Sequence, residues 1–578
     1  MQGNTIRGKK YLWQLPEIDQ QMVLSYASTY NLSVPVVQTL CSRGYVTSDD
    51  IESFLFSSFE KDVAHPEQLI DSQKAVNRIV QAIENKEKML VFGDYDVDGI
   101  TSSSLMMICL LPLGADINFF LPHRVLDGYG LSSKIVERAA RNNYKVIITV
   151  DNGITAFEPA CKAKELGIDL IITDHHKQHD ELPDAYAIVN PNRVDCPYPF
   201  KSLAGVGVTF KILSLLYERV GKPMPEKAYE LLLLGTIADV VPLLGENRFW
   251  VRHGLNYVNK QRSFPFLTLC KNGRVTKQTI SSLDIGFSVA PQINALGRLD
   301  DPRDGVAFLI GSDHKRVQEV GKILFELNQA RKDIERSIFQ QVDVHIKEKK
   351  IDLEKENIIL AASNSWPPGV IGLVASRLVS AYGKPTILLH ITEKGIAKGS
   401  CRSIPAFNIF DALHDSKDLL EQFGGHAHAA GLALKVDNIA ELKQKLEERV
   451  AQQLTPIDLE QKIMIDAHIK LGDLTKKFMN DINQLEPFGH ANAQPLFYAK
   501  DVVLVQEPQL LKDLHVKCRI FADGVIKPLI FFNRPELFEC FVNQGSDPFD
   551  VAVQATENHW NGRISIELLG TDVAGLKQ

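Results

Sequence analysis

The stretch from Met89 to Ser104, MLVFGDYDVDGITSSS, constrains this chain more than any other part of the sequence. Its first four residues, Met89 to Phe92, are apolar and predict a buried strand, which a glycine and a helix-like segment follow. Between them three carboxylates stand at every second position: Asp94, Asp96 and Asp98. Alternate spacing can place carboxylates on one side of an extended segment, where like charges repel unless a divalent cation holds them. A solvated, capped turn is the competing interpretation of this stretch alone.

The composition is that of a soluble globular protein, with 45% hydrophobic and 23% charged residues among 578. A chain of this length predicts three or four domains. Its net charge of -7 gives no general attraction to nucleic acid, so such binding needs a local basic groove or metal ions. Eight cysteines without a CxxC pair argue for a reducing compartment and against zinc or disulfides. Neither a signal peptide nor a membrane-spanning run is visible, and we expect a cytoplasmic protein.

An alternation of strands and helices begins after residue 70 and predicts a mostly parallel sheet. The strand-like runs are Met89–Phe92, Ile117–Leu121, Val146–Val150 and Asp169–Thr173. Functional sites of such sheets lie beyond the carboxyl ends of the strands. The residues found there are Asp94, Asp96 and Asp98; His123 and Arg124; Asp151 and Asn152; and Asp174, His175 and His176. Mixed Asp and His ligands suit Mn²⁺ or Mg²⁺, and several carboxylates can bridge two ions.

A further carboxylate, Asp239, follows an apolar helix-like segment over 228–237. Burying a lone Asp among apolar residues is costly, and metal coordination would offset that cost. A helix cap is the alternative interpretation of Asp239. The run Gly205-Val206-Gly207 opens another helix but lacks the third glycine of a dinucleotide-binding motif, so it predicts a structural tight turn.

The remaining segments predict the other parts of the chain. Residues 1 to about 70 predict a helical module, and 304–350 a long helix interrupted at Gly311 and Ser312. A second domain over about 355–450 has strands at 357–362 and 385–391 and two loops, GSCRS and FGGHAHAAGLAL. Short strands beyond about 455 predict a small barrel.

Four motifs, GDYDVDG, VDNG, TDHH and GTIADVVPL, resemble in this order those of the DHH phosphoesterase superfamily, and more narrowly of the RecJ-type single-strand-specific exonucleases. The resemblance extends over most of the chain from about residue 70, through PHRVLDGYGL, SLAGVGVTFK, INALGRLD, GVIGLVASRL, GSCRS and FGGHAHAAG. It implies an α/β fold with a mostly parallel-sheet DHH catalytic domain, a long helical connector, a second α/β (DHHA1) domain and a C-terminal OB-like β-barrel. The expected domains are 1–70 (helical module), 71–303 (catalytic), 304–354 (connecting helix), 355–453 (DHHA1, substrate binding) and 454–578 (OB-like, nucleic-acid binding).

The resemblance also implies an activity and a metal site. The activity is metal-dependent hydrolysis of single-stranded DNA in the 5′-to-3′ direction, in DNA recombination and repair. Two ions, Mn²⁺ or Mg²⁺, are expected at the positions matching Asp96, Asp98, Asp151, His175 and Asp239. Asp94 and His176 are expected as accessory groups, with His176 near the scissile phosphate. Many relatives have His where this chain has Phe92.

Contacts to the substrate strand are expected on both α/β domains. Arg124 can donate bidentately to a phosphate oxygen. Arg298, Ser400 and Arg402 are the candidates for the 5′-terminal phosphate, and His426 for a nearby contact. A cleft between the two domains, too narrow for a duplex, would explain selectivity for single strands. In the barrel, the candidates for base stacking and backbone contact are Phe531, Phe532, Trp560 and Lys517.

The expected partners are single-stranded DNA, a single-strand-binding protein and a helicase, with the chain acting as a monomer and without a membrane. Two other functions compete with the exonuclease. One is hydrolysis of short oligonucleotides or cyclic dinucleotides, against which the large C-terminal module argues. The other is a non-catalytic replication scaffold, which predicts loss of the metal ligands that this sequence retains.

Overall fold

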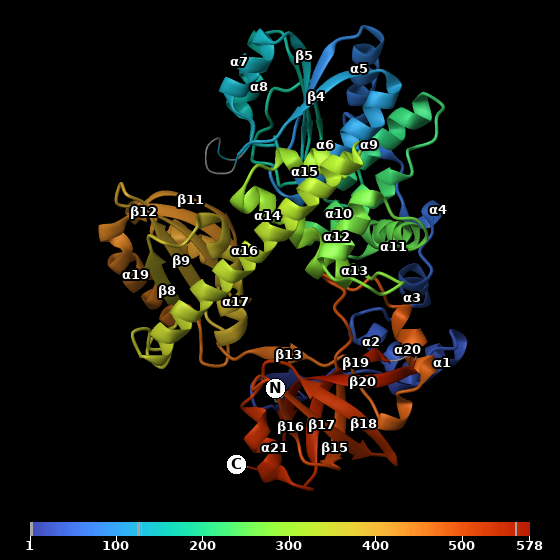
Figure 1. Cartoon of the computed structure of the whole chain (residues 1–578), viewed down its shortest axis with the longest axis vertical. Helices are drawn as coiled ribbons and strands as arrows, with labels where there is room; N and C mark the ends of the chain where they lie inside the picture. Colours follow the sequence, from blue (N-terminus) through green and yellow to red (C-terminus); the bar gives the residue numbers. More distant parts are fainter. Residues whose placement is uncertain (1–3, 124–127, 129, 561–562, 578) are drawn as a thin grey trace. The chain divides into compact units, whose positions relative to one another are not determined.

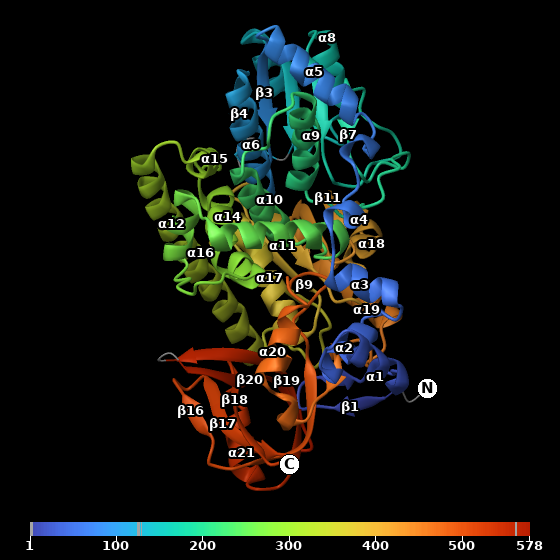
Figure 2. The same ribbon diagram turned by 90° about the vertical axis from the view of Figure 1, so that its right-hand side faces the viewer.

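A computed structural model describes residues 4–123, 128, 130–560 and 563–577 of the chain. These residues form two compact units (Figures 1 and 2). One unit comprises Ser48–Ala330 and Leu485–Ala493. The other comprises Met1–Thr47, Arg331–Gln484 and Gln494–Gln578. No helix among the described residues combines the length and the apolar character that crossing a membrane requires.

The Ser48–Ala330 unit contains the predicted parallel sheet. Its strands are β3 (Lys88–Phe92), β4 (Asp116–Phe120), β5 (Tyr144–Val150), β6 (Asp169–Thr173) and β7 (Ala187–Val189). They run parallel in the order β4-β3-β5-β6-β7. The four predicted strands are confirmed, whereas the three-residue β7 was not predicted because its run is too short to stand out as a strand.

Alternate residues of each strand serve two separate cores. Met89 and Val91 of β3 pack into the core under α5 (Ser72–Glu84), α6 (Val97–Leu110) and α9 (Gly205–Arg219). Leu90 and Phe92 pack into the opposite core, with α7 (Ser133–Arg141) and α8 (Phe157–Glu165). Both faces of the sheet are therefore covered by helices, as Figure 1 shows, and this explains why the strands are apolar throughout.

Helices make up the rest of this unit. They are α3 (Ser48–Leu55), α4 (Phe59–Asp62), α10 (Lys227–Ala238), α11 (Gly245–Lys260), α12 (Phe264–Asn272), α13 (Ser282–Asp284), α14 (Ala290–Leu299) and α15 (Arg303–Ile310). A π-helical segment, Ile285–Val289, joins α13 to α14. The long helix α16 (His314–Lys347) follows Gly311, which ends α15 with φ of 66°, so the predicted interruption is confirmed.

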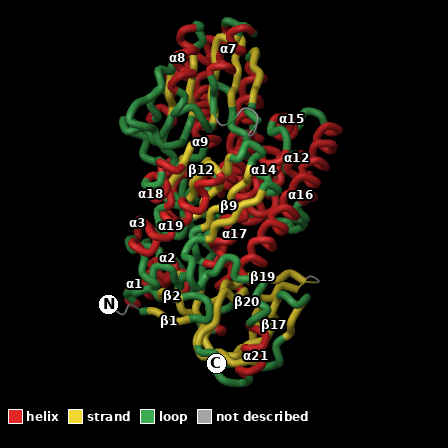
Figure 3. The backbone as a smooth tube through the Cα atoms, turned by 90° about the vertical axis from the view of Figure 1, so that its left-hand side faces the viewer, coloured by secondary structure: helices red, strands yellow, loops and turns green. Residues whose placement is uncertain are grey.

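A second α/β sheet lies in the other unit (Figure 3). Its elements are β8 (Ile359–Ser363), α17 (Pro368–Tyr382), β9 (Thr386–Ile391), β10 (Ile396–Arg402), α18 (Ile409–His414), β11 (Leu420–His426), β12 (Ala429–Lys435) and α19 (Ile439–Gln453). The sheet order is β11-β12-β10-β9-β8. The sequence placed GSCRS and FGGHAHAAGLAL in loops. That prediction is wrong, because GSCRS lies in β10 and the second motif is the β11–β12 hairpin, in which glycine leaves the sheet surface bare.

The C-terminal segment forms the predicted barrel. Its strands are β14 (Ala467–His468), β15 (Phe497–Leu504), β16 (Gln509–Leu511), β17 (His515–Ala522), β18 (Val525–Phe531), β19 (Phe549–Trp560) and β20 (Arg563–Ala574), with α20 (Lys476–Asn483) and α21 (Leu537–Gln544) beside them. Pairing of β15 with β17 closes the order β15-β19-β20-β18-β17. Phe531 is fully buried and packs against Phe541, so it cannot stack on a base, whereas Phe532 is 52% exposed. The side chain of Trp560 lies outside the described residues.

The N-terminal segment differs from the predicted helical module. It contains α1 (Gln20–Thr29) and α2 (Val34–Ser42), but it opens with two antiparallel strands, β1 (Thr5–Arg7) and β2 (Leu12–Gln14), and β2 pairs in parallel with β13 (Lys462–Met464). Trp13 of β2 is fully buried, and its Nε1 donates to the buried Asp572 of β20 at 3.0 Å. Three-residue strands carry too little pattern to be recognised from sequence, and here distant partners define them.

Removing the Asp572 carboxylate should loosen the N-terminal strands. The carboxylate also accepts from the amides of Lys10 (3.1 Å) and Tyr11 (2.9 Å), and each donor left unpaired in a buried place costs about 1–3 kcal/mol. We expect Asp572→Ala to speed hydrogen–deuterium exchange of these two amides at least about tenfold. Asp572→Asn, which keeps one acceptor oxygen, should have a smaller effect, and Glu539→Ala on α21 should have none. Unchanged exchange in Asp572→Ala would contradict this role.

Candidate metal centre

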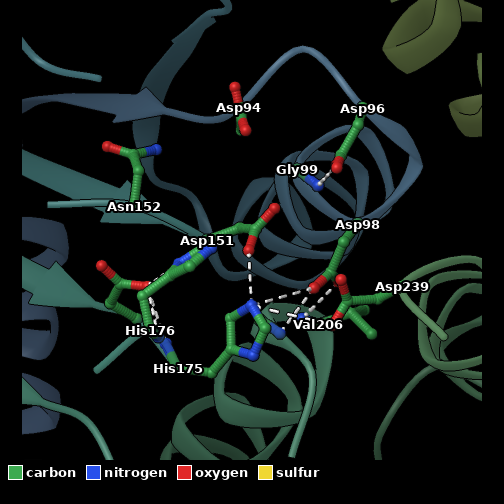
Figure 4. A network of polar contacts seen from close by, with 12 residues as sticks. Asp94, Asp96, Asp98, Gly99, Asp151, Asn152, His175, His176, Val206 and Asp239 are labelled. Carbon is green, nitrogen blue, oxygen red and sulfur yellow. Dashed lines mark hydrogen bonds and ion pairs between the residues drawn. The ribbon is translucent and has the colours of Figure 1, made fainter. Parts of the chain in front are cut away.

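The predicted ligands gather at the carboxyl end of the parallel sheet. With the order β4-β3-β5-β6-β7, chain direction across the sheet reverses between β3 and β5, and a crevice for ligands forms at such a switch point. The loop after β3 carries Asp94 and Asp96, and Asp151 follows β5 directly. Figure 4 shows the carboxylates of Asp151, Asp98 and Asp239 next to the His175 ring, with Asp94 and Asp96 farther from it; Asp239 is the C-cap of α10.

Helix α6, which follows β3, separates the three carboxylates that the sequence placed on one extended segment. Asp96 is the N-cap of α6, and its Oδ1 accepts from the Gly99 amide at 3.1 Å. Asp98 already lies within the first turn of that helix and is 1% exposed. The alternate spacing therefore does not form one face of a strand. Instead, the start of the helix turns Asp98 inward while Asp96 caps the amides.

The N-terminus of α9 holds the Asp98 carboxylate. The amide of Gly205 donates to Asp98 Oδ2 at 2.6 Å, and that of Val206 donates to Oδ1 at 2.7 Å. These amides have no partner within the helix, and the N-terminal end of a helix favours negative charge. A Cβ on Gly205 would lie 2.6 Å from Asp151 Cβ, so glycine is needed for the approach. The sequence predicted only a tight turn here, whereas the segment positions two of the candidate ligands.

Asp151 reaches the centre through an uncommon backbone conformation. Its φ is +61°, in the left-handed region that Asp tolerates better than most residues. Its amide donates to the carbonyl of Thr173 at 3.0 Å, which ties the end of β5 to the end of β6. The next residue, Asn152, donates to the carbonyls of Phe92 and Val150, so the same turn joins three strand ends.

The Nε2 atom of His175 lies among three carboxylates without a hydrogen-bond partner in the described chain. It is 3.1 Å from Asp151 Oδ1, 3.7 Å from Asp239 Oδ2 and 3.9 Å from Asp98 Oδ2. Neither this nitrogen nor Asp239 Oδ2 has a hydrogen-bond partner in the described chain, although both are buried. Burial lowers the pKa of His175 to about 4, so the imidazole is neutral near pH 7 and these contacts are not ion pairs. A neutral imidazole nitrogen facing carboxylates is suited to coordinating a cation.

Asp174 orders the histidine pair but does not face the cluster. Its Oδ1 accepts from the amides of His175 (2.7 Å) and His176 (3.1 Å) and from His176 Nδ1 at 2.7 Å. Burial by itself lowers the pKa of His176, but the hydrogen bond to Asp174 and its charge outweigh burial and raise that pKa to about 9. The two histidines therefore differ in charge. Asp174 is the first residue of the Asp-His-His triplet, but it is not among the site residues expected from the sequence.

The carboxylates resist ionisation together. Burial and the charge of Asp96 raise the pKa of Asp98 to about 7. Burial, with the charge of Asp98 second, also raises the pKa values of Asp151 and Asp239 well above the usual range. Three sets of ligand atoms each lie within 4.8 Å of one another: Asp151, His175 and His176; Asp98, His175 and Asp239; and Asp94, Asp96 and Asp151. A donor set of oxygens and imidazole with uncompensated charge fits hard divalent cations.

The predicted phosphate-binding residues are distributed over both units. Arg298 is in the last turn of α14, in the unit of the metal centre. Ser400 and Arg402 lie in β10, and His426 ends β11, in the other unit. Arg124 lies outside the described residues.

The Arg402 guanidinium is held in place by hydrogen bonds between β10 and α17. Its guanidinium donates to Ser376 Oγ (3.1 Å), Ser400 Oγ (3.1 Å) and the carbonyl of Cys401 (2.8 Å). A Cβ on Gly372 of α17 would lie 2.8 Å from Ser400 Oγ, so glycine leaves room for this arrangement. Two strands away, a Cβ on Gly424 of β11 would meet no atom within 4 Å.

The metal-free protein should lose stability as the pH rises. Because folding raises the pKa of Asp239, the folded state binds a proton that the unfolded state has already lost above about pH 4. Stability is therefore fully present at low pH and falls as the pH rises toward the folded pKa, by about 1.4 kcal/mol for each unit of pKa shift.

We expect Asp239→Asn to flatten this pH dependence. In EDTA, the variant should have the higher unfolding midpoint at pH 8 but no advantage at pH 4.5, in thermal melts followed by circular dichroism. Adding Mn²⁺ at pH 8 should stabilise the wild type more than the variant. The control Glu137→Asn removes an exposed carboxylate from α7 and should keep the wild-type slope. A slope in Asp239→Asn equal to that of the wild type would count against the charge repulsion.

Comparisons with known proteins agree with this geometry. Three family models match the chain: the DHH family N-terminal domain at 88–236, the DHHA1 domain at 355–452 and the RecJ OB domain at 465–572. The single-stranded-DNA-specific exonuclease RecJ of Bacillus subtilis is 35% identical over 567 residues, which cover 98% of this chain and 71% of that protein. RecJ of Escherichia coli is 31% identical, covering 93% and 95%. The crystal structure of Thermus thermophilus RecJ in complex with Mn²⁺ superposes with a TM-score of 0.82 at 25% identity, covering 98% of this chain and 80% of that one. With the candidate metal ligands at the sheet's switch point and relatives that match nearly the whole of this chain, the chain belongs to the RecJ family of the DHH superfamily.

Proposed function

We propose that the chain hydrolyses phosphodiester bonds of single-stranded DNA from the 5′ end, in the 5′-to-3′ direction, during DNA recombination and repair. The observation that carries this proposal is the cluster of buried carboxylates around a neutral His175, whose Nε2 has no hydrogen-bond partner in the described chain. The RecJ relatives, named as single-stranded-DNA-specific exonucleases, support the choice of substrate.

Two divalent ions, Mn²⁺ or Mg²⁺, would be held by Asp96, Asp98, Asp151, His175 and Asp239, with Asp94 as an accessory ligand. Their proximity in the described chain and the raised pKa values of three of the carboxylates support this set. When bound, such an ion pair activates a water molecule and neutralises charge on the phosphate and the leaving oxygen.

The protein's own groups orient the substrate. His176 carries a proton near pH 7 and is fixed by Asp174 through its Nδ1, so its other ring nitrogen can donate to an oxygen of the scissile phosphate. The ionised Asp174 keeps that proton on the imidazole. Burial raises the pKa of Asp174, but the hydrogen bond from His176, the charge of that histidine and the Ile154 amide together outweigh burial and lower it. Arg124, a further candidate donor, lies outside the described residues.

The 5′-terminal phosphate is assigned to Ser400 and Arg402, with Arg298 as a further donor and His426 nearby. The fixed orientation of the Arg402 guanidinium supports the assignment. An arginine held in place by three hydrogen bonds loses little further freedom on binding an anion. In the barrel, the exposed Phe532 is the remaining described aromatic candidate for base stacking, and Lys517 lies 3.7 Å from Glu567.

The same proposal includes the setting of the reaction. The described cysteines are all free thiols, which suits the reducing cytoplasm. A monomer that takes strands from a helicase or from a single-strand-binding protein belongs to this proposal as well.

Loss of Asp151 should abolish hydrolysis while leaving strand binding nearly unchanged. The side chain faces His175 at the centre, and its removal relieves repulsion rather than leaving a partner exposed. We expect Asp151→Ala to lower the rate of nucleotide release from a long 5′-phosphorylated single strand at least about 10³-fold in Mn²⁺, with a Kd for that strand within threefold of wild type. Glu137→Ala should retain full activity. A wild type that cleaves a dinucleotide faster than the long strand, or an active Asp151→Ala, would refute the proposal.

Arg402→Ala should weaken recognition of a terminal phosphate. Loss of a charge-assisted, bidentate contact costs about 1.5–3 kcal/mol, so KM for a 5′-phosphorylated strand should rise about 10- to 100-fold. KM for the matching 5′-hydroxyl strand should change less than threefold. The KM of Arg402→Lys for the 5′-phosphorylated strand should lie between those of the wild type and Arg402→Ala. Arg377→Ala, which removes a cation from α17 next to Ser376, should not discriminate between the two strands. Equal losses on both strands would remove the phosphate-binding role.

A further inference from the structure

The residue after the last candidate ligand has an unfavourable backbone conformation. Helix α10 ends at Ala238, Asp239 is its C-cap, and Val240 follows with φ of +59°. In this left-handed region a β-branched side chain is an outlier, because its Cβ substituents crowd the backbone. Among the described residues with positive φ, Val240 is the β-branched one, and the others include glycine, Asn, Asp and unbranched side chains.

The helix ending by itself does not explain the valine. A residue in the left-handed conformation commonly ends a helix, but glycine fills that position without strain. Gly311 and Gly383 end α15 and α17 in this way, both with φ of +66°. The Val240 side chain is also not needed for the core, since it is 62% exposed. Backbone strain of this kind clusters at active sites and ligand contacts, where the surrounding structure imposes it.

A second exposed apolar side chain belongs to the segment that packs on the same end of α10. A Cβ on Gly286 would lie 3.5 Å from Ile237 Cγ2, so the π-helical segment Ile285–Val289 lies against the last turn of α10. Phe287 of this segment is 77% exposed, the highest exposed fraction among the described phenylalanines that are exposed. Single-turn π-helical segments occur frequently at functional sites.

We propose that Val240 and Phe287 form an apolar contact surface for one nucleobase of the substrate strand, next to the metal centre. This inference rests on the proposed function. A strand whose scissile phosphate lies at the ions that Asp239 would help to hold places the attached sugar and base near that residue, and Val240 is its direct neighbour in the chain. Aromatic and apolar surfaces accept any base through its π-face, which suits an enzyme without sequence preference.

The nucleobase explains both observations together. In the free protein, the left-handed backbone of Val240 and the exposure of its apolar side chain are both unfavourable. Contact with a base offsets this cost by removing apolar surface from water. Base pairing in a duplex would keep that base stacked inside the helix, so the contact favours single strands.

The test combines protein variants with substrates that lack one base. The full chain is given 5′-phosphorylated single strands in which one of the first four nucleotides carries an abasic tetrahydrofuran residue. In the wild type, KM should rise about five- to twentyfold when the contacted base is missing. In the double variant Val240→Gly with Phe287→Ala, KM for the intact strand should rise by a similar factor, and the abasic residue should cause no further rise at that position.

Separate variants distinguish this role from a structural one. Val240→Gly removes the strain, so its thermal unfolding midpoint should equal or exceed that of the wild type while KM rises about threefold or more. Val240→Thr keeps the branched shape and should stay closer to wild type in KM. Leu267→Ala, which removes another exposed apolar side chain from α12, should change neither quantity.

Two outcomes would overturn the inference. One is a Val240→Gly variant with unchanged KM. The other is an abasic penalty at every position that is as large in the double variant as in the wild type. Both require a wild type that degrades the intact strand. Absence of that activity would instead refute the proposed function, so the two failures are distinguishable.

Discussion

Repulsion between buried carboxylates is the constraint on which the catalytic unit depends. Asp98, Asp151 and Asp239 come from three separate elements, and burial raises the pKa of each, with the charge of a neighbouring carboxylate as the next cause. The protonated His176 offsets this repulsion only in part, at Asp98, and His175 is neutral at the point where the three carboxylates meet. The fold therefore holds together groups that would separate in water. The parallel sheet makes this affordable, because its large apolar cores lie directly beneath the strand ends that carry the charges.

Backbone amides, rather than side-chain cations, hold this arrangement. Two amides of α9 fix Asp98, and Gly99 of α6 serves Asp96 in the same way. Amides lower the cost of a carboxylate without forming an ion pair with it, so the oxygens keep their capacity for a metal ion. The histidines follow the same logic. Asp174 accepts hydrogen bonds from both backbone amides of the pair and keeps His176 protonated. His175 stays neutral, and its Nε2, which has no hydrogen-bond partner in the described chain, lies beside the carboxylates.

The sequence was sufficient for the sheet and for the residues at its carboxyl end, because long apolar runs and the polar residues that end them are local signals. The four strands that precede Asp94, His123, Asp151 and Asp174 were predicted within one or two residues. Features defined by distant partners were not predictable. Trp13 lies in a three-residue strand that its pairing with β1 and β13 and its hydrogen bond to Asp572 define. The sequence around Gly205 predicted a simple turn, because the residue that requires a glycine there, Asp151, lies 54 residues away in the chain. The glycines of β10, β11 and β12 were assigned to loops, because a glycine-rich strand has the same composition as a turn.

Residues in the left-handed backbone conformation show how the requirements of the fold and of the site differ. At Gly311 and Gly383 the fold alone requires the conformation, and the residue with the least strain is present. At Asp151 the same conformation carries a side chain into the metal centre, and Asp tolerates it at a modest cost. Val240 tolerates it least, yet it stands beside Asp239 with its side chain in solvent. Stability favours glycine at such a position, so the valine has to be explained by an interaction that forms only when a substrate strand is bound.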